Sequence, residues 1–231
     1  MNFEDTLDYL PNKPVRQYQS RTIIYNPQNP GQNLYLVVSG RVKIIYVAFD
    51  GTQTIVRIAA PEGLFGEPAL LGPVEPREVA VALDRVTVMS WTPDELTRYI
   101  ERMPGLGLAL TRYFVVQSNI LQARIVSMAA YAIPERVSMA LIQLAAALGK
   151  PTQDGAMRIA SLTQCTIAEY VGTSREMLSL HMNHLRRRGF IRYSRQYIDV
   201  YTQLLSESLL EKGVNVNMTS HSGVLFRRAA G

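Results

Sequence analysis

The polar segment Thr173-Ser174-Arg175-Glu176 has side chains that suit the exposed edges of DNA bases. An arginine can form two hydrogen bonds with a guanine edge, and a glutamate can accept one from a cytosine amino group. Serine and threonine hydroxyls suit phosphate oxygens, and Ser179 lies one helical turn further on. We therefore expect Thr173, Ser174, Arg175, Glu176 and Ser179 to contact DNA.

Two short predicted helices position these side chains. Thr163 can cap a first helix that runs to about Val171, and Gly172 is the left-handed residue expected after it. Thr173 or Ser174 then caps a second helix over residues 175–188. A capped second helix after a glycine turn is typical of a helix-turn-helix, whose second helix enters the major groove by its N-terminal end. Apolar residues at the spacing of a tight helix pair are Ala168, Val171, Leu178, Met182 and Leu185.

Two predicted strands, 190–193 and 197–201, follow the second helix and are joined by Ser194-Arg195-Gln196. They form a β-hairpin wing, and Arg195 at its tip can reach a phosphate. Between Met177 and Ile198 the chain has five arginines and no acidic residue. Such a cationic surface suits the phosphate backbone, although a solvated basic face would have the same composition.

A long helix is predicted over residues 104–131, ahead of this motif. A stripe of residues recurs every three or four positions, at Leu110, Phe114, Gln117, Leu121, Ile125 and Met128, and all of them except Gln117 are apolar. A small β-domain alone cannot bury a stripe of this length, so we expect a symmetric partner helix and a two-fold dimer. An ordinary core helix within one domain is the alternative. Pro134 begins the next helix, 135–148, and the break before it is the expected hinge.

The first part of the chain, residues 15–92, predicts a β-rich domain. Short runs rich in valine, isoleucine, tyrosine and threonine are separated by turn residues, and Asp50-Gly51 is a strong hairpin signal. Many short strands indicate a sandwich or a barrel. Thr92-Pro93-Asp94-Glu95 then begins a helix with a capping box.

Composition limits the other classes of function. A chain of 231 residues with 47% hydrophobic and 19% charged residues suits two small globular domains. No apolar run could span a bilayer, and the acidic N-terminus lacks a secretory signal, so we expect a cytoplasmic protein without a membrane partner. Cys165 is the single cysteine and no histidine precedes His181, so we expect no disulfide, metal or haem cofactor. Cys165 is expected to have a packing or surface role, and His181 and His184 are expected to face DNA or solvent.

The chain resembles the CRP/FNR family of bacterial transcription regulators. The resemblance covers residues 15–201 and is carried by three strings: Leu34-Tyr35-Leu36-Val37-Val38-Ser39-Gly40-Arg41-Val42-Lys43, Leu64-Phe65-Gly66-Glu67 and Val171-Gly172-Thr173-Ser174-Arg175-Glu176. It implies an α+β fold with a cupin-like β-roll sensor (1–103), a dimerisation helix and hinge (104–133), a winged helix-turn-helix (134–201) and a C-terminal helix and tail (202–231). It also implies a homodimer that reads two inverted half-sites about one helical turn apart.

The resemblance extends to single positions. Thr163 matches a residue that contacts the DNA backbone, and Leu180 stands where many members have another base-reading arginine. In members that bind cyclic nucleotides, a glycine-glutamate pair meets the ribose and an arginine followed by serine or threonine holds the phosphate. Glu78 stands at the serine or threonine position here, and a carboxylate beside a phosphate is repulsive.

We therefore expect Glu67 and Arg77 to pair with each other or with Glu78 as a structural cluster, and cyclic nucleotide to be a doubtful effector. Leu121 and Gln122 replace the hydroxyl residues that would face the purine from the dimer helix. The candidates for an effector pocket are Gly66, Glu67, Arg77, Glu78, Gln117 and Leu121.

Together these features predict a transcription regulator and not an enzyme. The expected partners are double-stranded DNA with inverted repeats, a second copy of the chain and RNA polymerase. One alternative is a cupin-type metal enzyme, which the lack of histidines before His181 disfavours. Another is a ligand-binding module that regulates a protein partner, which the arginine-rich wing disfavours. The effector, the operator sequence and the choice between activation and repression remain open at this stage.

Overall fold

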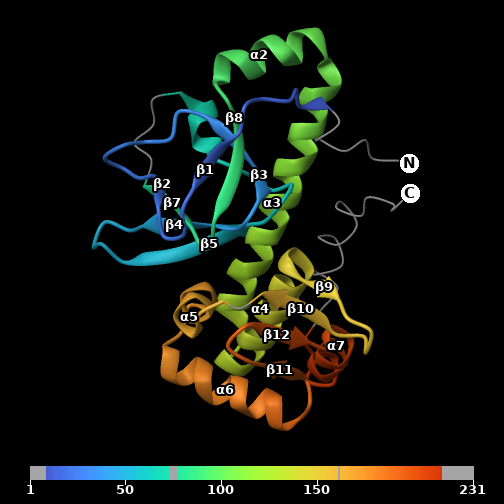
Figure 1. Ribbon diagram of the computed structural model, residues 1–231. Helices are drawn as coiled ribbons and strands as arrows, with labels where there is room; N and C mark the ends of the chain where they lie inside the picture. The colour runs from blue at the N-terminus through green and yellow to red at the C-terminus, as the bar shows by residue number, and fades with distance from the viewer. Residues whose placement is uncertain (1–8, 73–76, 161, 215–231) are drawn as a thin grey trace. The chain divides into compact units, whose positions relative to one another are not determined.

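The computed structural model describes residues 9–72, 77–160 and 162–214 (Figure 1). The chain divides into two compact units, the first ending at Val115 and the second beginning at Val116. This boundary lies inside the long helix α3 (Pro104–Ala130), which therefore contributes to both units.

The first unit contains two four-stranded antiparallel sheets. One has the order β1 (Arg16–Tyr18), β8 (Val86–Trp91), β3 (Leu34–Ser39) and β6 (Leu64–Phe65). The other has the order β2 (Ile23–Tyr25), β7 (Glu78–Ala82), β4 (Val42–Val47) and β5 (Gln53–Ala59). Both sheets contribute to one apolar core, which includes Val37, Phe65 and Val88 from the first sheet and Ile24 and Ile44 from the second. The predicted two-layer β-domain is therefore confirmed.

Local signals in the sequence account for the turns of this unit. Gly51 adopts a φ of +83° between β4 and β5, and Thr52 donates its backbone N–H to Asp50 at 2.9 Å. A short 3-10 helix, η1 (Glu67–Leu71), follows β6. Thr92 and Glu95 form the predicted capping box at the start of α2 (Pro93–Arg102).

The start of α3 packs within the first unit. Leu106 and Leu110 are buried in a second apolar cluster with Leu34, Leu64 and Trp91, and Phe114 packs against it. The two ends of the predicted stripe therefore differ in burial along α3. Leu110 and Phe114 are core residues, whereas Leu121, Ile125 and Met128, in the second unit, remain exposed.

The second unit is built around α4 (Ile133–Leu148), whose residues from Val137 to Ile142 are all buried. The pair α5 (Gln164–Val171) and α6 (Arg175–Arg187) packs against α4, as does α7 (Thr202–Leu210). A four-stranded sheet completes the unit, in the order β11 (Ile191–Tyr193), β12 (Tyr197–Val200), β10 (Met157–Ala160) and β9 (Lys150–Pro151). The wing was predicted as a hairpin alone, and β9 and β10 extend it to a sheet.

The predicted break between the two long helices is confirmed, since α3 ends at Ala130 and α4 begins at Ile133 with Pro134 in its first turn. The helix expected after the wing is α7, and the tail from residue 215 lies outside the described residues. None of the helices in the described parts of the chain combines the length and hydropathy that crossing a lipid bilayer requires.

Candidate nucleic-acid interface

The first helix of the DNA-binding motif begins and ends as its sequence predicts. The Thr163 hydroxyl accepts the backbone N–H of Thr166 at 3.1 Å and caps α5. Gly172 follows the helix with a φ of +73°, and the N–H groups of Gly172 and Thr173 both donate to Ala168. A left-handed residue at this point reverses the chain within one turn, which brings α6 directly against α5.

The second helix, α6, separates an apolar inner face from a polar N-terminal end. Ser174 caps the helix by accepting the Met177 N–H at 3.2 Å. Ser174, Arg175 and Glu176 are all exposed. Thr173 and Ser179 are half-buried beside them, while the inner face buries Leu178, Met182 and Leu185.

The charge of Glu176 is favoured by its place in the first turn of α6. Its own backbone N–H and the Ser174 side chain lower the pKa of the Glu176 carboxyl below its usual value. A carboxylate near a helix N-terminus is also stabilised by the helix dipole. Glu176 is therefore an ionised hydrogen-bond acceptor at neutral pH, as recognition of a cytosine amino group requires.

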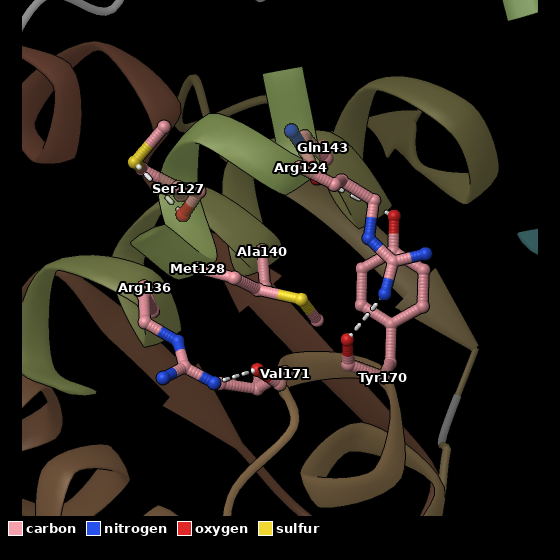
Figure 2. Close-up of a pocket in the computed structure, with 9 residues that line it drawn as sticks. Arg124, Ser127, Met128, Arg136, Ala140, Gln143, Tyr170 and Val171 are labelled. Carbon is pink, nitrogen blue, oxygen red and sulfur yellow. Dashed lines mark hydrogen bonds between the residues drawn. The ribbon is translucent and has the colours of Figure 1, made fainter. Parts of the chain in front are cut away.

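Two arginines, which we call the arginine clamp, hold the C-terminal end of α5 (Figure 2). Arg124 of α3 donates to the Tyr170 carbonyl at 2.7 Å and lies 4.1 Å from the centre of the Tyr170 ring. Arg136 of α4 donates to the carbonyls of Val171 and Gly172 at 2.6 and 2.7 Å. These carbonyls have no partner within the helix, and cations at a helix C-terminus also match its dipole. The clamp thus fixes the turn that leads into α6.

The arginine clamp was not predicted. The carbonyl that Arg124 contacts lies 46 residues away in the sequence, beyond the reach of local sequence patterns. The two arginines also line a small cavity of about 20 Å³, drawn in Figure 2, which has room for about one water molecule.

The wing is held by a buried acid. Asp199 of β12 has no exposed surface, and Arg158 of β10 donates to both of its carboxylate oxygens at 2.6 and 2.8 Å. Arg192 of β11 donates to Asp199 at 3.2 Å and also pairs with Asp154. The hydrogen bond from Arg158, together with both arginine charges, lowers the pKa of the Asp199 carboxyl.

The five arginines of this region therefore do different things. Arg192 is engaged by acids, Arg186 lies 5.2 Å from the centre of the Tyr193 ring, and Arg188 lies 4.5 Å from that of Phe190. Arg187 and Arg195 are exposed, and Arg195 is in the turn between β11 and β12 as predicted. The Tyr193 hydroxyl also donates to Asn183 of α6 at 3.1 Å, which ties the wing to the helix.

The two histidines of α6 differ in burial. His184 is exposed, but the Nε2 atom of His181 is buried and has no hydrogen-bond partner among the described residues. Burial lowers the pKa of His181, and the charges of His184 and Lys212 lower it further. The His181 side chain is half-buried and is therefore only partly directed to solvent, and the charges of the Glu135–Lys212 ion pair act on it. Cys165 is exposed, within its expected range of roles.

The sensor candidates of the first unit have partners other than those expected. Glu67 accepts two hydrogen bonds from Arg57 at 2.9 and 3.0 Å, and Glu78 accepts one from the Tyr25 hydroxyl. The Arg77 guanidinium lies 3.0 Å from the centre of the Phe49 ring. The predicted pairing of Glu67 and Arg77 is therefore wrong, because β5 brings Arg57 to Glu67 while Arg77 stacks on the β4–β5 hairpin.

Backbone geometry and burial complete the description of these candidates. Gly66 has a φ of +85°, and a Cβ atom there would lie 2.5 Å from the Asn33 carbonyl oxygen, so only glycine fits. Burial raises the pKa of the Glu78 carboxyl, and the charge of Glu67 adds to this effect. The two remaining candidates, Gln117 and Leu121, belong to the second unit, where Gln117 is half-buried and Leu121 is exposed.

A β-roll, a long helix and a winged helix-turn-helix with an exposed, capped reading end define a class of DNA-binding transcription regulators. Comparison with known proteins gives the same class. Residues 15–103 match the family described as cyclic nucleotide-binding domain, and residues 135–205 match the Crp-like helix-turn-helix domain.

A curated relative, the CRP-like cAMP-activated global transcriptional regulator of Mycobacterium tuberculosis, is 32% identical over 171 residues, which are 73% of this chain and 75% of the relative. Among solved structures, FixK2 from Bradyrhizobium japonicum aligns with a TM-score of 0.71 at 20% identity, over 84% of this chain and 96% of that one. A CRP/FNR family regulator from Thermus thermophilus aligns with a TM-score of 0.66 at 25% identity, over 84% and 97%. The chain belongs to the CRP/FNR family: it is a DNA-binding transcription regulator and not an enzyme.

Proposed function

We propose that this protein binds operators of two inverted half-sites as a homodimer. The observation that carries the proposal is the exposed N-terminal end of α6, which Ser174 caps while the rest of the helix anchors it in the core. In this proposal Arg175 and Glu176 meet base edges, with Ser174 beside them. The remaining contacts are with the phosphate backbone, from Thr163, Thr173, Ser179 and Arg195.

The second half of α3 supports the dimer. Leu121, Ile125 and Met128 share one face of the helix at spacings of four and three residues, and they are 40%, 66% and 40% exposed. Val126 is exposed beside them. A contiguous apolar stripe is costly to leave in water, and a symmetric copy of the same stripe covers it. Ile125→Arg would shift the sedimentation of the protein from dimer to monomer, whereas the exposed control Leu204→Arg on α7 would leave it unchanged.

The arginine clamp suggests how the break between α3 and α4 acts on DNA binding. Arg124 precedes the break and Arg136 follows it, and both hold the carbonyls at the end of α5. A rotation at residues 131–132 therefore changes the support of the turn that leads to α6. In our proposal an effector shifts the population between two settings of this break, only one of which lets both reading helices engage DNA.

We propose that the effector is not a cyclic nucleotide, although the mycobacterial relative is named as cAMP-activated. Glu78 takes the place of a hydroxyl donor beside the expected phosphate, and Arg57 already neutralises Glu67. We expect 1 mM cAMP to leave the thermal unfolding of the protein unchanged. Glu78→Ser removes the repulsive group and would give a measurable shift. A shift of several degrees with the unaltered protein would contradict this part of the proposal.

Selection of bound DNA from a random pool tests the main function. We expect enrichment of an inverted repeat whose half-site centres lie about one helical turn apart. Footprinting with the selected site would protect both half-sites, and RNA polymerase can then be added to ask whether it joins the complex. No enrichment at low salt and micromolar protein would overturn the proposal, because low salt favours every phosphate contact.

A further inference from the structure

An apolar residue lies on the exposed face of α6. Leu180 is 60% exposed, in the middle of the helix proposed to read DNA. At about 100° per residue, Leu180 projects about 165° away from the mean direction of the buried Leu178, Met182 and Leu185. Glu176 lies one turn before Leu180 on the same line, and Arg187 lies two turns after it. A helix that enters the major groove therefore presents Leu180 to the base pairs next to those that Glu176 meets.

We infer that Leu180 reads the methyl group of a thymine in the operator half-site. The C5-methyl group of thymine is the apolar group on the base edges of the major groove, where the other features are hydrogen-bond donors and acceptors. A leucine can satisfy none of those polar groups, but it gains from covering a methyl group. Met177, 37% exposed and three residues before Leu180, widens the apolar patch.

Exposure alone does not carry this inference, since single exposed leucines are common on protein surfaces. Leu204 and Leu210 of α7 are 47% and 55% exposed. What distinguishes Leu180 is its place between two charged residues on the exposed line of the helix whose N-terminal end carries Arg175 and Glu176. The inference rests on the proposed function, because it requires that α6 lies in the major groove.

The test uses the operator selected by the full-length protein. Each thymine of a half-site is replaced in turn by uracil, which removes the methyl group and leaves the base pairing intact. One of these replacements would weaken binding by the unaltered protein about fourfold, the value of one methyl group removed from water. Leu180→Ala would bind the thymine-containing operator and the uracil-substituted operator with equal affinity. Leu210→Ala, the matched exposed leucine outside α6, would retain the fourfold difference.

A second variant tests the same base position of the operator with a side chain that forms hydrogen bonds. Leu180→Arg would shift the selected base at that position from thymine to guanine, because an arginine can bond to both acceptors of the guanine edge. An enriched operator that no uracil replacement weakens would overturn the inference while leaving the proposed function in place. The same holds if Leu180→Ala and the unaltered protein lose equal affinity on methyl removal. A pool without any enriched sequence would count against DNA reading itself.

Discussion

The two units of this protein use their charged side chains in opposite ways. In the first unit, which holds the sensor candidates and is called the sensor unit here, Glu67 is neutralised by Arg57 and Glu78 accepts a hydrogen bond from Tyr25. These polar groups are therefore satisfied inside the domain. In the DNA-binding unit Arg175 and Glu176 are exposed at the start of α6. The first arrangement stabilises a fold, and the second leaves hydrogen-bonding capacity for a partner. Because the polar groups at the family's sensor positions are already engaged within the first unit, the family match says little about the effector. The exposed polar groups at the start of α6 instead support a specific function, which is contact with DNA bases.

The DNA-binding unit itself repeats this contrast on a smaller scale. Asp199 is fully buried and engaged by Arg158 and Arg192, only a few residues from the exposed Arg195. Variants of inner residues should therefore change stability, and variants of outer residues should change DNA binding.

The largest effect is expected for Asp199→Ala. Its loss leaves Arg158 and Arg192 without their buried partner, but both arginines are about half exposed and can be hydrated. We expect a loss of about 2–3 kcal/mol in the free energy of unfolding, below the range for a fully buried pair. Urea unfolding measures it. Asp154→Ala, which removes an exposed partner of Arg192, should cost less than about 1 kcal/mol. Equal losses in the free energy of unfolding for the two variants would contradict the distinction between the buried Asp199 and the exposed Asp154.

Arg175→Ala should have the next largest effect, on specificity. Loss of a two-hydrogen-bond contact with a base costs about 1–3 kcal/mol, or about five- to 150-fold in discrimination at one position of the half-site. Competition binding with single-base operator variants measures it, and the free energy of unfolding should not change. Glu67→Gln in the sensor unit is the opposite control, since it should lower stability and leave the preferred sequence intact. A preferred sequence unaltered by Arg175→Ala would contradict the assignment of α6 as the reader.

Two acids should change the stability with pH in opposite directions, and each unit of pKa shift corresponds to about 1.4 kcal/mol in the free energy of unfolding. The folded pKa of Glu78 is raised by burial, so its stabilising contribution is complete below an unfolded pKa of about 4.3 and is lost as pH rises through the folded value. The pKa of Asp199 is lowered, so its contribution is complete above about pH 3.9 and is lost as pH falls.

Trp91, the single tryptophan, is buried in the sensor unit, so its fluorescence in urea titrations from about pH 2 to 8 follows that unit. Glu78→Gln should remove the loss of stability at higher pH. NMR signals of β12 amides in the same urea series follow Asp199, with Asp199→Asn as the comparison. A sensor unit whose pH profile is the same with and without Glu78 would refute the first half of this prediction.

Arg195→Ala should have the smallest effect, and it should be independent of sequence. Each phosphate contact contributes about 0.9 to the slope of log K against log salt, so a dimer that loses two contacts should show a slope shallower by about 1.8. Fluorescence anisotropy over a salt series measures the slope. Gln196→Ala, in the same turn, is the uncharged control. A change in the preferred base would show instead that the wing reads sequence.

Much of this organisation could be predicted from local patterns. Thr163, Gly172 and Ser174 signal the ends of the two helices by their own backbone preferences, and Asp50-Gly51 does the same for a hairpin, so each element was found from a few neighbouring residues. The α3 stripe was found by its period, but its division between core and exposed residues was not. That division depends on where the sensor core ends along the helix.

Contacts between distant residues were not predictable in the same way. Arg57 meets Glu67 because β5 brings it to η1, whereas the resemblance to the family's nucleotide-binding positions favoured Arg77 as the partner. Strands β9 and β10 were missed because they are short and the first contains Pro151, which usually disfavours a strand.

The arginine clamp limits how this regulator can diversify. Because its two arginines come from opposite sides of the α3–α4 break, inserting or deleting a residue between Ala130 and Ile133 would move one of them relative to the carbonyls at the end of α5. In our proposal, new operator preferences can arise by exchanging side chains on the outer line of α6, since these make no contribution to that support. The number of residues in the break cannot change in the same way. Descendants of this protein should therefore vary in the sites they recognise more readily than in the number of residues that join their two long helices.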